Sequence, residues 1–424
     1  MKILAIHGGP KTIIEQFKPY NSIGREEIMV ATKILESGQL SQFIGSWGNR
    51  FLGGSKVLEF EKAWAKHFKV KYAVSFNSLT SGLIAAVGAI GIEPGDEVIT
   101  SPWTMCATAT SILVWNAIPV FADIEENTYN LDPKSIEKNV TKRTKAIIVP
   151  DIFGQSANLN EIMKIAKKYS LMVIEDAAQA PNSKYGKKYT GTIGDIGGYS
   201  LNYHKHIHTG EGGVMVTNNK KLAEKMRLIR NHGEAVVGPK GEKDIANIIG
   251  FNFRLGEIEA AIGLEQLKKL EKLTADKIGA GTILTKRLKK LPGLIPPFVG
   301  KNNTHVYYIY GFRIDEKRTG VSREKIIKAL QAEGIPHIYE GYQNLHLLPM
   351  YQRKIAYGTK GFPWKRSIYK GNVKYNKGIC PVAERLNDKE LICLQICQHK
   401  YTKEEIDLVV KAFHKVWNNL DELK

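Results

Sequence analysis

Short runs of apolar residues alternate with helix-period segments between about residue 70 and residue 230. The apolar runs predict strands at 71–76, 97–101, 119–124, 145–150, 171–175 and 214–217. The segments between them repeat apolar residues at helical spacing and predict helices at 80–90, 107–115, 161–168 and 221–231. Nearly continuous apolar strands separated by helices are typical of a mostly parallel sheet covered on both faces. The pattern therefore predicts a large α/β domain.

The second half of the chain has a different pattern. Residues 234–247 are rich in Gly and charge and predict a loop, and residues 254–287 predict one long or broken helix. The prolines and glycine of 291–297 mark the expected domain boundary. We expect a large domain at 1–290, which includes an N-terminal segment and the connecting helix. A smaller α+β domain is expected at 291–424, with a strand at 306–314 and helices at 323–333 and 403–417.

The composition is that of a soluble protein with ample core, since 43% of the 424 residues are apolar. The N-terminal apolar run is broken too early for a signal peptide, and the best later run, 111–124, is too short to span a bilayer. We expect a cytoplasmic protein without a membrane partner. No metal site is expected, because no paired metal motif is formed by the four cysteines, Cys106, Cys380, Cys393 and Cys397.

The net charge of +19 favours anionic partners in general. Nucleic acid is one such class, but the basic residues are spread along the chain and no recognised nucleic-acid motif is present. We therefore expect no nucleic-acid partner. Sugar nucleotides, cofactor phosphates and a merely solvated basic surface all remain open as explanations of the charge.

Lys205 stands in the most informative segment, Ser200-Leu201-Asn202-Tyr203-His204-Lys205, which Thr209-Gly210-Glu211-Gly212-Gly213 follows. A lysine is most often a surface residue. This one lies between a strand end and a Gly-rich turn, where backbone can approach a ligand closely. Its amine becomes nucleophilic when desolvation disfavours the ammonium form. The setting favours a chemical role for Lys205.

Three other segments stand at predicted strand ends or helix starts. Asp176 falls at the carboxyl end of an apolar strand, where open α/β sheets place ligands. Its carboxylate can hold a pyridinium nitrogen protonated, or it can simply cap a helix. Residues 77–82 combine hydroxyls with a predicted helix N-terminus, which is a suitable phosphate cradle. Residues 250–254 open the long helix. Ordinary capping also explains each of the last two segments alone.

Together these four segments resemble the DegT/DnrJ/EryC1/StrS family of pyridoxal-phosphate (PLP) sugar aminotransferases. The resemblance covers about 26–269, and its specific part is Ser-x4-Lys-x4-Gly-Glu-Gly-Gly after Glu-Asp-Ala-Ala-Gln. It implies the aspartate-aminotransferase-like fold, known as PLP fold type I. It also implies that Lys205 holds the cofactor as a Schiff base and moves the substrate proton. Asp176 would pair with the pyridine nitrogen, and Gln179 would lie near the ring hydroxyl.

The resemblance further implies how the cofactor phosphate is held. Ser78, Leu79 and Ser200 would bind it, the first two partly through backbone amides. Asn252 would reach the phosphate of a second subunit, which makes a homodimer the expected active unit. Some relatives have His at the cofactor-lysine position and dehydrate sugars instead. Lys205 at that position favours amine transfer.

One departure from the family pattern concerns the residue that stacks on the cofactor ring. Relatives carry an aromatic residue after the Thr of a Pro-x-x-Thr stretch, and here that residue is Met105. Either the Met105 thioether packs on the ring or Trp103 takes its place. The alternating His204, His206 and His208 could share one face of a strand and bind a metal. Positioning around the cofactor or substrate is the favoured alternative, because the segment already matches the cofactor signature.

The expected function is transfer of an amino group from glutamate or glutamine to a ketosugar that is nucleotide-linked. A cyclitol aminotransferase acting on a deoxy-inosose is the nearest alternative. A ketosugar dehydratase is a weaker one, because Lys205 opposes it. A cofactor-sensing regulator would need a DNA-binding module, and no helix-turn-helix precedes the first predicted strand near residue 70.

Overall fold

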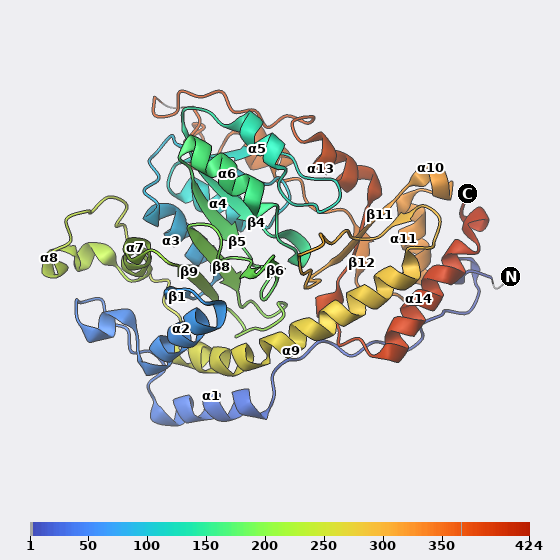
Figure 1. Cartoon of the computed structure of the whole chain (residues 1–424), viewed down its shortest axis with the longest axis horizontal. Coiled ribbons are helices and arrows are strands. Elements are labelled where there is room, and N and C mark those ends of the chain that lie inside the picture. The colour runs from blue at the N-terminus through green and yellow to red at the C-terminus, as the bar shows by residue number, and fades with distance from the viewer. Residues whose placement is uncertain (1–2, 366) are drawn as a thin grey trace.

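The computed structural model describes residues 3–365 and 367–424, and a long helix joins its two main sheets (Figure 1). The larger sheet has the strand order β1-β9-β8-β5-β4-β2-β3, and within it only β9 runs against the others. This confirms the predicted mostly parallel sheet. Its strands are β1 (Tyr72–Phe76), β2 (Glu97–Thr100), β3 (Ile118–Phe121), β4 (Thr144–Pro150), β5 (Met172–Asp176), β8 (Ile196–Ser200) and β9 (Gly213–Thr217).

Helices cover both faces of this sheet, as its apolar strands require. On one face, α3 (Leu79–Ala89), α4 (Ala107–Val114) and α7 (Lys220–Arg230) form a core with Ile148 of β4. Ile147 of β4 points to the opposite core, because side chains alternate along a strand. The helices on that face are α2 (Ser55–Phe68), α5 (Pro133–Asn139), α6 (Leu159–Tyr169) and the first half of α9 (Glu257–Leu288), while α1 (Arg25–Ser37) packs on α9.

Helix α9 links the large sheet to the C-terminal sheet (Figure 1). Leu267 and Leu270 pack in the core of the large sheet, whereas Leu284 and Leu288 pack in the core of the small one. The small sheet is antiparallel, with the order β10-β11-β13-β12. Its elements are β10 (Leu294–Ile295), β11 (Tyr310–Ile314), β12 (Ile338–Glu340), β13 (Leu391–Leu394), α10 (Glu316–Thr319), α11 (Arg323–Ala332) and α14 (Lys403–Trp417).

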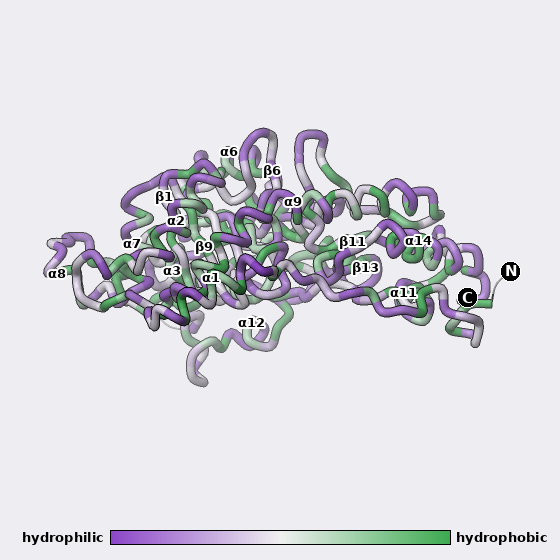
Figure 2. The backbone as a smooth tube through the Cα atoms, turned by 90° about the horizontal axis from the view of Figure 1, so that it is seen from below, coloured by the Kyte–Doolittle hydropathy of each residue, from purple (hydrophilic) through white to green (hydrophobic). Residues whose placement is uncertain are grey.

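Two segments pack on the far side of the predicted boundary at residue 290. Leu4, Ile13 and Phe17 belong to the core of the C-terminal sheet. Conversely, Tyr351 of α12 (Pro349–Arg353) and residues through α13 (Pro381–Arg385) join the core of the large sheet. Figure 2 shows the segment after α12 projecting from the rest of the molecule. The division at 290 stays a prediction. Segments from each side of it pack in the core of the sheet on the other side.

Some predicted elements differ from the observed ones for local reasons. The predicted loop 234–247 contains a short helix, α8 (Val237–Lys240). The predicted strand 306–314 begins only at Tyr310, because Tyr307 has a φ of 50°, which interrupts extended backbone. A small hairpin pairs β6 (Lys184–Tyr185) with β7 (Lys188–Tyr189). Among the described helices, none combines the length and apolar character needed to cross a bilayer.

Candidate active site

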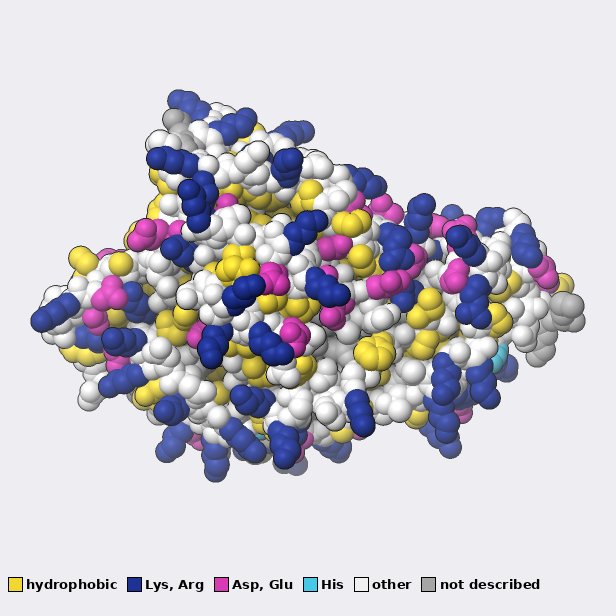
Figure 3. Space-filling view, turned by 45° about the horizontal axis from the view of Figure 1, so that its top comes forward, with side chains coloured by type: hydrophobic (Ala, Val, Ile, Leu, Met, Phe, Trp, Pro, Cys, Tyr) yellow, Lys and Arg dark blue, Asp and Glu magenta, His cyan; other side chains and the backbone are white. Residues whose placement is uncertain are grey.

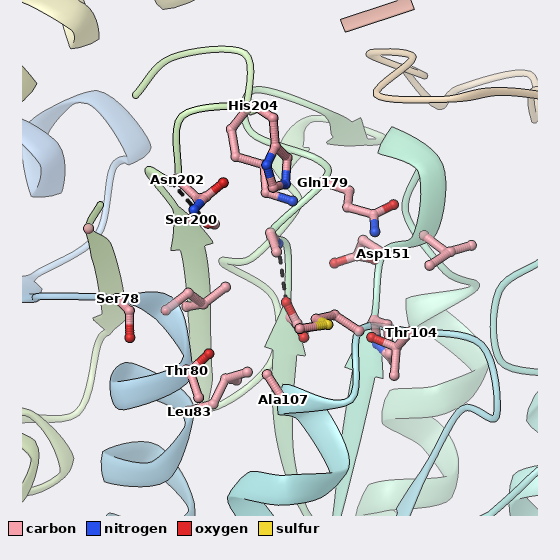
Figure 4. A pocket seen from close by; sticks show the side chains of 18 of the residues that line it. Ser78, Thr80, Leu83, Thr104, Ala107, Asp151, Gln179, Ser200, Asn202 and His204 are labelled. Carbon is pink, nitrogen blue, oxygen red and sulfur yellow. Dashed lines mark hydrogen bonds between the residues drawn. The ribbon is translucent and has the colours of Figure 1, made fainter. Parts of the chain in front are cut away.

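A cavity of about 180 Å³ opens at the carboxyl ends of β4 and β5, beside the start of α3 (Figure 4). Open parallel sheets place ligands at such strand ends. The cavity is lined by all of the predicted site residues except Asn252, namely Ser78, Leu79, Met105, Asp176, Gln179, Ser200 and Lys205. Segments far apart in the sequence therefore converge on one site.

Lys205 lies in the turn that follows β8, and its side chain is buried in the cavity wall. The turn is held by its backbone N–H, which donates to the Asn202 carbonyl at 2.9 Å. The Nζ atom lies 4.2 Å from the centre of the Tyr308 ring. Burial lowers the pKa of Lys205 to about 8, although the nearby Asp176 charge acts in the opposite direction. At pH 7 an amine with this pKa is neutral and nucleophilic in about a tenth of the molecules, far more than an ordinary lysine.

Asp176 ends β5 and faces the same cavity. Its Oδ2 accepts a hydrogen bond from the Thr108 hydroxyl at 2.7 Å, and its Oδ1 accepts one from the Ala178 amide at 3.2 Å. Burial raises the pKa of Asp176, while both hydrogen bonds and the Lys205 charge lower it. The residues directly after Asp176 form turns and lead into β6 rather than a helix, so the alternative that Asp176 caps a helix is wrong. Thr108, on α4, gave no signal in the sequence.

The start of α3 forms the opposite end of the cavity from Gln179. Ser78 caps the helix by accepting the Ser81 amide at 3.1 Å. The amides of Leu79 and Thr80 in the first turn have no partner within the helix. A Cβ added to Gly213 would come within 2.4 Å of the Leu79 nitrogen, so only glycine leaves room for this close approach. With Ser200 across the cavity, these groups suit a phosphate.

The structure distinguishes between the two candidates for the ring-stacking position. Met105 lines the cavity and is 61% exposed. Trp103 is fully buried outside it, where its indole N–H donates to Asn344 Oδ1 at 2.7 Å. The Trp103 ring also packs near Phe153. Trp103 is therefore occupied in the core, and Met105 is the side chain placed to contact a ring in the cavity.

The three alternating histidines do not share a face. Residues 203–207 form turns rather than a strand, which removes the premise of the metal alternative. His204 lines the cavity, and burial together with the Lys205 charge lowers its pKa to about 4. His206 is buried at the junction of the two sheets, where its Nε2 lies 2.9 Å from the Val306 carbonyl. Only His204 is therefore placed to contact a ligand.

Gln179 shows how the rest of the cavity wall is built. Its Oε1 accepts the Phe153 amide at 2.7 Å, and its Nε2 lies 3.3 Å from the hydroxyl of Tyr342. Tyr342, Tyr308 and the cavity residue Asp151 were all missed in the sequence, because they lie outside the matched motifs. The contacts of Tyr342 and Tyr308 exist only once the C-terminal segments pack on the large sheet.

Asn252 lies apart from this cavity. It is exposed, and its Oδ1 accepts a hydrogen bond from Arg254 Nε at 2.7 Å. The backbone of Asn252 forms a bridge with Asn231. Within one chain Asn252 therefore has no contact with the cavity, and its predicted role in a second subunit stays a prediction.

Comparisons with known proteins place this geometry in a family. The model of the DegT/DnrJ/EryC1/StrS aminotransferase family matches residues 23–375. The spore coat polysaccharide biosynthesis protein SpsC of Bacillus subtilis is 37% identical, over 84% of this chain and 90% of that protein. The GDP-perosamine synthase of Caulobacter vibrioides is 37% identical over 70% and 79%. A putative L-glutamine:3-amino-2,3-dideoxy-scyllo-inosose aminotransferase of Streptoalloteichus tenebrarius is 29% identical over 99% of both chains.

Solved structures agree with this assignment. The aminotransferase from Psychrobacter cryohalolentis superimposes with a TM-score of 0.82 at 27% identity, over 96% of this chain and 100% of that one. The fold is accordingly PLP fold type I, as predicted. The chain belongs to the DegT/DnrJ/EryC1/StrS aminotransferase family and is a PLP-dependent aminotransferase.

Proposed function

We propose that this enzyme moves an amino group from glutamate or glutamine to the keto carbon of a nucleotide-linked sugar. Lys205 and Asp176 are the proposed catalytic residues. The observation that carries the proposal is the buried Lys205 amine, which faces the same cavity as the Asp176 carboxylate. A lysine of lowered pKa is suited both to attack a carbonyl carbon and to shuttle a proton.

The residues present fit the cofactor. The first turn of α3 with Ser78 and Ser200 offers donors to its phosphate, and Asp176 offers a carboxylate to its ring nitrogen. Met105 lies where a ring face can rest on it. When bound, PLP withdraws electrons from the carbon that loses its proton. Lys205 then takes that proton on Nζ and returns it, because its pKa lies close to neutrality.

Charge supports a nucleotide-linked substrate. The surface carries an excess of basic side chains, and Figure 3 shows Lys and Arg spread over the visible face among acidic and apolar groups. Such a field attracts diphosphate esters. One relative is a GDP-perosamine synthase by name, and its name specifies a nucleotide-linked product. An uncharged cyclitol would draw no advantage from this field.

A homodimer is part of the proposal. Apolar side chains stand exposed on α1, namely Ile28, Met29 and Leu35. The cavity residue Met105 is likewise exposed, so a second subunit would cover the opening as well as this surface. Asn252 would then contribute to the partner's phosphate site. Mixing Lys205→Ala with Asn252→Ala subunits should restore activity in exchanged heterodimers, since one of the two sites is intact.

The test of the proposed function is a substrate panel with mass-spectrometric detection of aminated product. The purified enzyme, loaded with PLP and supplied with glutamate or glutamine, should aminate a nucleotide-linked ketosugar. Lys205→Arg is the matched control, because it keeps a cation but removes the primary amine. Borohydride reduction should fix the cofactor on Lys205. Amination of scyllo-inosose derivatives alone would instead support the cyclitol alternative, which the inosose aminotransferase relative suggests.

A further inference from the structure

Asp151 is a buried carboxyl group in the cavity wall that the proposed reaction does not use. It follows β4 directly, and its amide donates to the Asp176 carbonyl at 3.0 Å, which places the two acids at adjacent strand ends. Its side chain is 1% exposed and lines the cavity. Figure 4 shows Asp151 and Gln179 on one side of the cavity and Ser78 and Ser200 on the other.

The two oxygens of Asp151 differ in their contacts. Oδ1 accepts a hydrogen bond from the Ala157 amide at 3.0 Å. Oδ2 is buried and has no hydrogen-bond partner among the described residues. A buried polar atom without a partner is uncommon in folded proteins and calls for a ligand or another explanation. Here the atom belongs to a residue that lines a ligand-sized cavity, so a bound ligand is the natural partner.

The charges of two other carboxyls, Glu175 and Asp176 of β5, act on Asp151, and the contacts of each acid influence where a proton is held. Burial raises the pKa of Glu175 as well, but Glu175 accepts the amides of Gly191, Ile193 and Gly194 at 2.6 to 2.7 Å, and these three bonds favour its charged form. Asp176 accepts two hydrogen bonds and faces the Lys205 charge.

Asp151 has the weakest support for a negative charge among these three acids, because it accepts a single amide. Burial, reinforced by the charges of Glu175 and Asp176, raises the pKa of Asp151 well above its usual range. The phenol of Tyr199, the other titratable group that senses Asp151, stays neutral because burial raises its pKa as well. Of the three acids, Asp151 is therefore the one on which a proton is most readily held, and in that form it has a hydroxyl to donate.

We propose that Asp151 donates a hydrogen bond to the phenolic oxygen of the PLP ring. The proposal rests on the proposed placement of PLP in this cavity. That oxygen lies on the half of the ring away from the phosphate arm, next to the carbon that Lys205 attacks. With the phosphate held by Ser78 and Ser200, this half faces the wall of Asp151 and Gln179. Gln179 Nε2 already donates to the Tyr342 hydroxyl at 3.3 Å and keeps one further N–H, so Asp151 adds a second donor to this wall.

Infrared difference spectroscopy of PLP binding to the apoprotein tests this directly. The wild type should show the carbonyl band of a protonated carboxyl that shifts when PLP binds, and Asp151→Asn should lack that band. Asp123→Asn is the matched control, because Asp123 is a buried acid outside the cavity that accepts the amides of Val382 and Ala383. A band that persists in Asp151→Asn would overturn the proposal.

PLP affinity gives a second readout that does not depend on turnover. Asp151→Asn keeps a neutral donor and should bind PLP within about twofold of the wild type, whereas Asp151→Leu should bind about five- to tenfold more weakly. Wild-type affinity in Asp151→Leu would overturn the proposal even if the infrared band is present. If the wild type binds no PLP, the proposed function fails together with the proposal for Asp151. If the wild type binds PLP and Asp151→Leu binds it equally well, only the proposal for Asp151 fails.

Discussion

Two buried lysines lie in different regions of the molecule, and comparing their contacts shows why only one of them is suited to catalysis. Lys205 lies in the cavity and Lys277 in α9, where the two sheets meet, and the ammonium of each lies over a tyrosine ring. Burial lowers the pKa of both. Lys277 Nζ, however, donates to the carbonyls of Ile396 and His399, whereas Lys205 faces the cavity and Asp176. Burial alone therefore does not identify a catalytic lysine.

The largest expected difference between the two lysines is in turnover. Lys205→Met should lower turnover by about four orders of magnitude or more, because both the nucleophile and the proton carrier are lost. Lys277→Met should retain activity in the fraction that folds, since Lys277 is not among the cavity-lining residues. Steady-state rates normalised to folded, PLP-bound protein measure both effects. Comparable losses in the two variants would refute the distinction.

The Asp176 carboxylate is a second difference between the two lysines. It shares the cavity with Lys205, whereas Lys277 does not line that cavity. Asp176→Asn should lower turnover by about a hundredfold, since an amide cannot stabilise a protonated ring nitrogen. The fold should persist, because the Asn oxygen can still accept the Ala178 amide while its NH2 group donates to the Thr108 hydroxyl. Turnover and the absorbance of bound cofactor check this together. Near-normal rates would limit Asp176 to a structural role.

The free energy of unfolding should fall in Lys277→Met and rise in Lys205→Met. Lys277→Met leaves the Ile396 and His399 carbonyls without their donor and should lower the free energy of unfolding by about 1 to 3 kcal/mol. Lys205→Met in the apoprotein removes a buried charge whose lowered pKa marks a net cost, and it should raise the free energy of unfolding at pH 7 by about 3 kcal/mol. Urea unfolding measures both, and destabilisation by Lys205→Met would contradict the expectation.

The gain from Lys205→Met should also depend on pH. The folded pKa of Lys205, about 8, lies below the usual value of 10.5, so the unfolded state binds more protons between these values. The penalty for burying the charge is complete below pH 8 and is relieved as the pH rises toward 10.5. The stability advantage of the variant should therefore shrink over this window. A constant difference from pH 7 to pH 10 would exclude this origin.

Thr108→Val should have the smallest effect. It removes one hydrogen bond to Asp176 while keeping the shape of the side chain. Loss of one hydrogen bond to a charged group predicts a fall in turnover of about tenfold. Thr110→Val is the matched control on the same helix, because the two hydrogen bonds that Asp176 accepts come from Thr108 and Ala178 and not from Thr110. Equal effects of the two substitutions would mean that the helix, rather than the bond, is responsible.

The motif residues could be predicted because each lies in a contiguous segment with its own local signal. Lys205 and Asp176 follow strand ends, and Ser78 precedes a helix, so sequence order alone places them at one edge of a parallel sheet. Asp151 follows a strand in the same way, but it belongs to none of the segments singled out. Its significance depends on an unpartnered oxygen that only the packed structure reveals.

Other features were beyond the sequence because they depend on packing between distant segments. Trp103 and Met105 are only two residues apart in the sequence. Their roles differ because Trp103 is buried against Asn344 and Phe153. Thr108 faces Asp176 only because α4 packs beside β5. Helices α1 and α2 were not predicted at all, although both pack on the α9 helix that was.

The docking of the N-terminal segment on the C-terminal domain has a consequence for biosynthesis. The Ala5 amide donates to Glu333 Oε1 across 328 residues of chain, and Lys415 Nζ donates to the Pro10 carbonyl. During translation, residues 4–17 leave the ribosome long before α11 and α14 exist to receive them. These early residues must wait, unpacked, until nearly the whole chain has been made. Completion of the core of the C-terminal sheet is therefore a late event in synthesis, after the large sheet can already form.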